Sequence, residues 1–116
     1  MESNDAVKRL SALAQDSRLA VFRQLVKAGP EGQAAGEIAR SLEITPNTLS
    51  AQLTILANAG LVTSRRDGRS IIYAADYDGM SELLLYLMED CCQGRAEVCA
   101  PLALVATACC DQPQAC

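Results

Sequence analysis

The sequence predicts a mainly α-helical domain in which a helix-turn-helix is followed by a two-stranded β-hairpin wing, with about five helices in all. Half of the 116 residues are apolar but only four are aromatic, so Leu, Ile, Val and Ala must build the core, which favours helices. Two short helical segments, 34–42 and 46–58, follow each other with almost no linker. Two strand-like runs, 61–66 and 69–75, then flank Asp67-Gly68.

The first two helices are predicted from apolar spacing and from turn residues. Residues 4–14 carry apolar side chains at helical intervals, namely Val7, Leu10, Leu13 and Ala14. Asp16 or Ser17 is expected to cap a second helix that runs to Lys27, and Gly29-Pro30 ends it. Its inward residues are expected to be Leu19, Phe22, Leu25 and Val26.

The helix-turn-helix is predicted from residues 34–58. A third helix ends at Leu42, and only Glu43 and Ile44 separate it from Thr45, which caps the fourth helix. Pro46 suits the first helical position, and Gly60 ends this helix. Two short helices therefore meet through a tight turn, and a basic hairpin follows as a wing.

A fifth helix is predicted from Tyr77 to Gln93, with Gly94 as its stop. Its apolar stripe is wider than one small domain needs, and it comprises Met80, Leu83, Leu84, Leu87 and Met88. The surplus predicts an α-helical dimer interface that the first helix joins. We therefore expect a DNA-binding and dimerisation domain over 1–93 and a cysteine-rich tail over 94–116.

Charge is divided unevenly along the chain. The net charge is −4, yet residues 1–69 hold nine basic and seven acidic residues, whereas residues 70–116 hold one basic and seven acidic residues. The front of the chain is therefore the part suited to phosphates. No run approaches the length of a membrane span, and the acidic N-terminus is unlike a secretory signal, so a cytoplasmic location without a membrane partner is expected.

The fourth helix predicts a DNA-reading face. If Leu49, Leu53 and Leu56 form its buried seam, the opposite face carries polar groups small enough for a major groove, with Thr48 and Gln52 on its flank. That face consists of Asn47, Ser50, Ala51, Thr54 and Asn58. The hairpin adds three cations for phosphates or the minor groove: Arg65, Arg66 and Arg69. Either feature alone is also typical of a solvated surface, but their joint order favours duplex DNA as partner.

These segments closely resemble the ArsR family of winged-helix, metal- and metalloid-responsive repressors over about residues 8–92. The most specific parts are Asp16-Ser17-Arg18-Leu19, Thr45 to Leu56, Ala59-Gly60-Leu61-Val62 and Arg65 to Tyr73. The resemblance implies a homodimer on an imperfect inverted repeat, released from DNA by an inducer. It assigns DNA contact to Thr45, Asn47, Thr48, Ser50 and the wing arginines. Ala51 stands where many members have His, which leaves the base preference open.

Two sensor sites of the family are absent from this sequence. The arsenic site before the recognition helix needs a Cys-x-Cys motif, and residues 34–42 contain no cysteine. The zinc site of the last helix uses His, and the chain has none. Some members instead bind As(III) through a Cys-Cys-x-Gly-Arg/Lys motif and a later cysteine just past the last helix, a pattern similar to Cys91, Cys92 and Cys99 here.

The chemistry of the six cysteines points to the same ligand class. In a reducing compartment free thiols are expected, and soft thiolates select soft ions such as As(III) or Sb(III). Cys91, Cys92 and Cys99 form one candidate set, and Cys109, Cys110 and Cys116 repeat the pattern as a possible second set.

Other interpretations of these cysteines stay open. Cys91 and Cys92 also fit as small buried apolar residues, and the last three as part of a merely thiol-rich tail. The alternative functions are a thiol-redox repressor of the same fold and a sensor of Cd(II) or Hg(II). Without a CxxC motif, a His or a nucleotide loop, we expect no enzyme and no organic cofactor.

Overall fold

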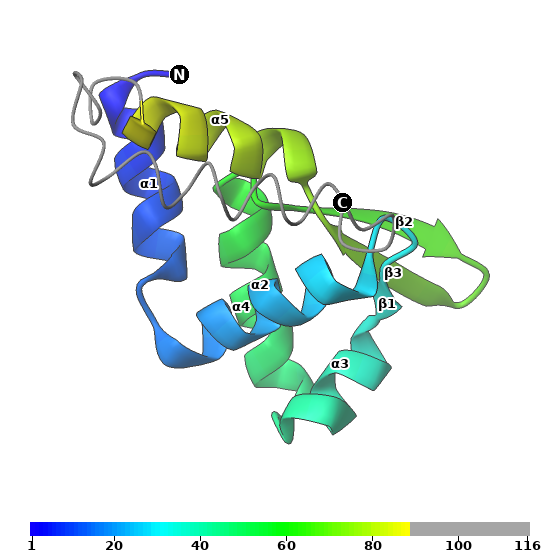
Figure 1. The fold of residues 1–116 in the computed structure, drawn as a ribbon. Coiled ribbons are helices and arrows are strands. Elements are labelled where there is room, and N and C mark those ends of the chain that lie inside the picture. Colours follow the sequence, from blue (N-terminus) through cyan, green and yellow to red (C-terminus); the bar gives the residue numbers. More distant parts are fainter. Residues whose placement is uncertain (89–116) are drawn as a thin grey trace. The chain divides into compact units, whose positions relative to one another are not determined.

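The computed structural model describes residues 1–88, in which the predicted winged helix-turn-helix is confirmed (Figure 1). The elements in chain order are α1 (Ser3–Leu13), α2 (Asp16–Ala28), β1 (Gln33–Ala34), α3 (Ala35–Leu42), α4 (Pro46–Asn58), β2 (Val62–Asp67), β3 (Ser70–Ala75) and α5 (Tyr77–Met88). The chain divides into two units, Met1–Leu83 and Leu84–Cys116. The first unit holds every element except the last five residues of α5, and the domain boundary expected at 93/94 lies outside the described residues.

The start of α2 differs from the expectation. Neither Asp16 nor Ser17 caps it, because both already belong to the helix. The cap is Gln15, whose side-chain oxygen accepts a hydrogen bond from the Arg18 N–H at 2.9 Å. Gln is outside the usual set of capping residues, so its role was not visible in the sequence. The helix ends as predicted at Gly29, which has a φ of 86°.

The core of the first unit lies where α2, α3 and α4 meet. Its largest fully buried side chains are Val21, Leu25, Ile38, Leu49, Leu53, Leu56 and Leu61. One inward assignment was wrong: Leu19 is exposed, and Val21 is buried instead. Within residues 1–88 no helix is long and apolar enough to cross a membrane.

The sheet has three strands where two were expected. It is antiparallel in the order β1-β3-β2, and β1 adds two residues, Gln33 and Ala34, opposite Tyr73 and Ile72. A two-residue strand shows no alternation in the sequence, so the sequence predicts no strand at Gln33 and places Ala34 in the third helix. In the first unit the β2-β3 hairpin projects beyond the helices (Figure 1).

The hairpin turn is displaced by one residue from the predicted position. Asp67 pairs with Ser70, so the two central residues are Gly68 and Arg69 rather than Asp67 and Gly68. Gly68 has a φ of 64°, whereas the φ of Arg69 is not positive. Positive φ at the first position alone is the pattern of a type II′ turn, so the expected type I′ turn was wrong. Arg69 therefore sits in the turn itself.

Candidate nucleic-acid interface

The turn between α3 and α4 fixes the direction of the candidate recognition helix. Glu43 adopts a left-handed conformation with a φ of 55°, and the Ile44 N–H donates to the Ala39 carbonyl at 3.0 Å. The chain thus reverses within two residues, as a helix-turn-helix requires. Leu49, Leu53 and Leu56 anchor α4 in the core as predicted, and the helix turns a fixed opposite face outward.

Thr45 begins α4 through its side chain. Its Oγ1 accepts from the Thr48 N–H at 3.4 Å and lies 2.8 Å from the Thr48 Oγ1, to which it donates. Pro46 follows at the first helical position. Both threonines are exposed, so the pair forms part of a surface that carries the positive end of the helix dipole. The predicted cap is confirmed, while DNA contact by these threonines stays a prediction.

The outward face of α4 is polar and accessible. Every residue assigned to it is exposed: Asn47, Ser50, Ala51, Thr54 and Asn58. The Thr54 hydroxyl donates a hydrogen bond to the Ser50 carbonyl at 2.9 Å, so it can only accept a hydrogen bond from a ligand. Asn47 and Ser50 make no side-chain hydrogen bond within residues 1–88, which leaves both groups available to a base edge or a phosphate.

Gln52 departs from the expected position on the flank of this face. It is only 7% exposed, and its Oε1 accepts no hydrogen bond from the described part of the chain. The buried side of α4 is wider than the leucine seam, since Gln52 and Ala59 join it. The exposed placement was therefore wrong, and this conformation does not present Gln52 to DNA.

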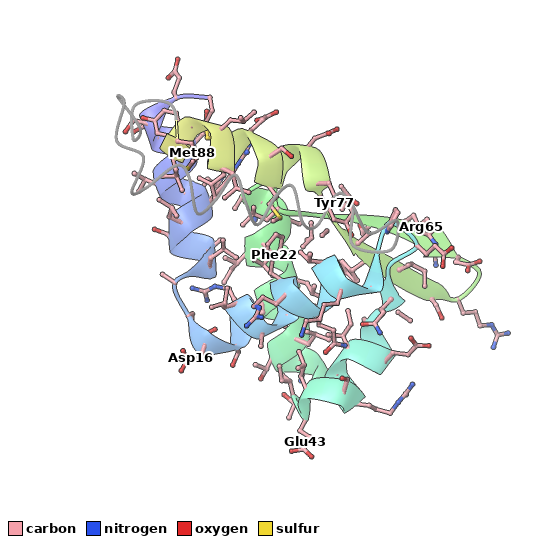
Figure 2. All side chains as sticks on the ribbon, in the orientation of Figure 1. Asp16, Phe22, Glu43, Arg65, Tyr77 and Met88 are labelled. Atoms are coloured by element: carbon pink, nitrogen blue, oxygen red, sulfur yellow. The ribbon has the colours of Figure 1, made fainter. Side chains whose placement is uncertain are left out.

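The three wing arginines differ in their surroundings. Arg65 and Arg66 are neighbours on β2 and so point to opposite faces of the hairpin. Arg65 donates from Nη2 to the Glu31 carbonyl at 2.9 Å, which ties the wing to the loop after α2 (Figure 2). In the described residues Arg66 and Arg69 form neither a hydrogen bond nor an ion pair, so these two are the better candidates for phosphate contacts.

A groove of about 410 Å³ lies between α4, the wing and the start of α3. Ser50 lines it from α4, Arg69 and Tyr73 line it from the hairpin, and the buried side chains of Leu49 and Leu53 lie beneath it. The fold thus brings together two predicted DNA contacts, Ser50 and Arg69, from segments far apart in the sequence. A polar helix face and a wing cation on one surface is the arrangement of a groove-and-backbone reader of duplex DNA.

Comparisons with known proteins agree with this geometry. A family described as helix-turn-helix domain matches residues 13–65. The HTH-type transcriptional regulator NmtR of Mycobacterium tuberculosis is 37% identical over 75 residues, covering 65% of this chain and 60% of NmtR. HlyU from Vibrio cholerae is 32% identical with a TM-score of 0.60, covering 75% of this chain and 97% of HlyU.

A further structure bears on the type of regulator. It is the homodimeric winged helix-turn-helix DNA-binding domain of a possible ArsR-family transcriptional regulator from Mycobacterium bovis, with 28% identity and a TM-score of 0.62, covering 73% of this chain and 77% of that chain. The uncharacterized HTH-type transcriptional regulator YceK of Bacillus subtilis is 34% identical over 71 residues, covering 60% of this chain and 70% of YceK. The chain belongs to the HTH-type transcriptional regulators. The match spans about three fifths of the length of its first curated relatives.

The residues predicted to bind a metalloid all lie outside the described part of the chain. All six cysteines follow residue 90 and lie outside the described residues. Within residues 1–88 no group of His, Cys, Asp and Glu is positioned to hold a metal ion. Thiol ligation by Cys91, Cys92 and Cys99, and by Cys109, Cys110 and Cys116, therefore stays a prediction.

The regulator exposes apolar residues on the two helices that were expected to form the dimer interface. On α1, Val7 is 58% exposed and Leu10 is 42% exposed. On α5, Leu84, Leu85 and Leu87 are exposed as well. Exposed large aliphatic side chains at helical spacing are typical of a protein interface, which agrees with the predicted dimer without testing it.

Proposed function

We propose that this regulator is a homodimeric repressor that binds an imperfect inverted repeat in duplex DNA and leaves it when As(III) or Sb(III) binds C-terminal thiols. The observation that carries the DNA part is the shared surface of Ser50 on α4 and Arg69 on the wing. In a dimer, two such surfaces would meet successive major grooves about one helical turn apart. Thr45, Asn47, Thr48 and Arg66 would add backbone and base contacts.

The metalloid part is supported by the thiol pattern. Cys91, Cys92 and Cys99 offer three sulfurs in the sequence that follows Met88, and the chain has no His to compete as ligand. Arsenous acid would exchange its three hydroxyl groups for three thiolates: three As–S bonds form, three As–O bonds break, and three waters leave with the thiol protons. No electron is transferred, so the exchange needs no oxidant.

The first experiment tests DNA binding on the full chain. The duplex is selected from a random library by the wild-type protein, and its affinity is measured by fluorescence anisotropy at several salt concentrations. We expect log K to fall linearly with log salt, with a slope of about −0.9 per phosphate neutralised. Binding that ignores salt, or no selected duplex at all, would contradict the proposal.

The second experiment titrates the protein-DNA complex with arsenite, antimonite, Cd(II) and peroxide in parallel, all but the last under a thiol-free phosphine reductant. A metalloid sensor releases DNA with arsenite under reducing conditions, with a change in affinity of about 5- to 150-fold. Cys91→Ser and Cys92→Ser should keep DNA binding and lose this release, and Cys116→Ser serves as the control from the second set. Release by peroxide alone would favour the redox alternative, and normal release in both mutants would exclude the site.

A further inference from the structure

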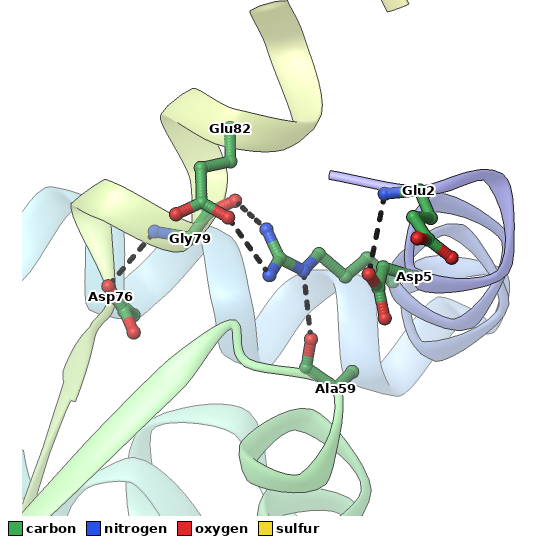
Figure 3. Close-up of polar contacts among 7 residues, drawn as sticks. Glu2, Asp5, Ala59, Asp76, Gly79 and Glu82 are labelled. Carbon is green, nitrogen blue, oxygen red and sulfur yellow. Dashed lines mark hydrogen bonds and ion pairs between the residues drawn. The ribbon is translucent and has the colours of Figure 1, made fainter. Parts of the chain in front are cut away.

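Arg9 connects α1 with the end of α4 and the start of α5 through one side chain. Its Nε donates to the Ala59 carbonyl at 3.1 Å, and its Nη1 donates to the Gly79 carbonyl at 2.6 Å. Its Nη2 forms an ion pair with Glu82 at 3.3 Å (Figure 3). Arg9 belongs to α1, Ala59 is the C-cap of α4, and Gly79 and Glu82 lie at the start of α5. The side chain is only 14% exposed.

The two helix ends that Arg9 bridges also touch backbone to backbone. A Cβ at Gly79 would collide with the Gly60 carbonyl oxygen, so the first turn of α5 rests directly on the residue after the α4 cap. The Asp76 N–H donates to the Leu61 carbonyl at 2.8 Å, and the Asp76 Oδ1 accepts from the Gly79 N–H at 3.0 Å. The end of the recognition helix and the start of α5 therefore form one rigid junction.

The charge of Arg9 suits this position. The Ala59 carbonyl is one of the acceptors that the C-terminal end of a helix leaves without an intrahelical partner. A cation there interacts favourably with the helix dipole, and charge-assisted hydrogen bonds in a partly buried site are stronger than neutral ones. Arg9 points inward from α1, whereas Val7 and Leu10 point outward into the predicted dimer surface. One helix thus joins that surface to the end of α4.

We propose that Arg9 is a positioning residue for DNA binding. Through its hydrogen bonds, the position of α4 is coupled to the positions of α1 and of the first turn of α5. Arg9 acts at the end of α4 opposite to Thr45 and the DNA-facing turns, so it needs no contact with DNA. Resting on the proposed function, the same junction carries the inducer signal, because Cys91 and Cys92 follow the last described residue of α5 by three and four positions. A metalloid that moves α5 then moves α4 through Arg9.

Arg18 provides a matched control. Like Arg9 it donates to two backbone carbonyls, but both belong to α1: its Nε donates to Ala12 at 2.7 Å and its Nη2 to Ser11 at 3.4 Å. Among the described residues it forms no hydrogen bond with α4 or α5. Arg9→Met and Arg18→Met remove the same charge and keep a similar apolar stem. Any difference between the two variants in DNA affinity therefore reports the bridge rather than the loss of a cation.

The test measures the selected duplex at a temperature where circular dichroism shows both full-length variants folded. We expect Arg9→Met to weaken binding about 10-fold, within the range for coupled sites, and Arg18→Met to weaken it less than about threefold. Because Arg9 contacts no phosphate, its loss should leave the salt slope unchanged, whereas Arg66→Met should lower the slope by about 0.9. Equal losses in the two variants, or a reduced slope for Arg9→Met, would overturn the proposal.

Two further variants keep the test decisive. If Arg9→Met does not fold, Arg9→Lys retains the charge on a point-like ammonium that cannot span the three acceptors, and we expect an intermediate loss of affinity. Glu82→Gln removes the exposed ion pair and spares both carbonyl bonds, so it should change binding less than about twofold. A loss in Glu82→Gln as large as in Arg9→Met would show that the carbonyl bridge is not the cause.

The inducer arm compares DNA affinity with and without arsenite. We expect the ratio to move toward one in Arg9→Met while the number of arsenic atoms bound per chain stays the same. A variant that keeps the full wild-type ratio would refute the coupling role. If the wild type itself shows no response to arsenite, the metalloid function fails, and the affinity and salt measurements still decide the role of Arg9.

Discussion

Gly79→Ala and Gly36→Ala apply the same chemical change to two helical glycines and should shift stability in opposite directions. Gly79 lies in the first turn of α5, and Gly36 lies in the first turn of α3. Neither has a positive φ, so alanine suits the backbone at both positions. The difference is the space available to the new methyl group.

At Gly36 the methyl group meets only the Nη1 of Arg40 at 3.7 Å, the mobile end of a long side chain. The substitution therefore keeps the gain in helix propensity, about 0.5 to 1 kcal/mol. At Gly79 it meets the Gly60 carbonyl, and neither backbone can give way by rotating a side chain. Overpacking costs about 1 to 3 kcal/mol, which outweighs the gain in propensity and leaves a net loss of about 1 to 2 kcal/mol.

Thermal unfolding of the full chain measures both effects. For a chain of this length 1 kcal/mol corresponds to about 4 °C in Tm. We expect Gly36→Ala to raise Tm by about 2 to 4 °C and Gly79→Ala to lower it by about 4 to 8 °C. All proteins are compared at one concentration, because the Tm of a dimer depends on concentration. If both variants move Tm in the same direction, the close approach of α5 to Gly60 is not a feature of the molecule.

Three other substitutions separate stability from DNA contact. Thr45→Ala removes the cap of α4 and should cost about 1 kcal/mol in urea unfolding, while Thr45→Ser should cost much less; equal losses would contradict the cap. Leu53→Ala empties a fully buried position and should cost about 2 to 5 kcal/mol, and a loss below 1 kcal/mol would show that the position is not packed. Arg66→Gln should leave Tm unchanged and reduce the salt slope of DNA binding by about 0.9; an unchanged slope would exclude a phosphate contact.

The limits of α1 to α4 and the start of α5 were predictable to within about a residue because short-range chemistry decides them. Thr45 and Pro46 begin α4, and Gly29 and Gly60 end α2 and α4 with positive φ, as glycine after a helix commonly does. These signals act over a few residues and need no knowledge of the rest of the fold. The leucine seam of α4 follows from the same local periodicity.

Three of the errors have the opposite property, because the pairing or packing of whole segments decides them. The strand β1 exists only because Gln33 and Ala34 pair with β3, which lies about forty residues later in the sequence. Gln52 is buried because the inward side of α4 is wider than its leucine seam. A polar side chain gives no local signal that it will be buried. The hairpin turn moved by one residue because strand register is a property of the pair, and Gly68 satisfies either register.

The Arg9 junction was missed for a related reason, although the sequence does hold a signal for it. Its acceptors are mainly backbone carbonyls, 50 and 70 residues away from Arg9, and any residue type supplies those. The signal is the pairing of two anomalies: an arginine on the inward side of α1 between Ala6 and Ala12, and a glycine inside the first turn of an apolar helix. A cation facing a core needs fixed acceptors, and a helical glycine with no turn to make indicates close backbone approach. Together the two anomalies predict that a helix end docks where the arginine points. That position lies at the far end of the helix that is predicted to face DNA, where we expect a substitution to change affinity without touching the nucleic acid.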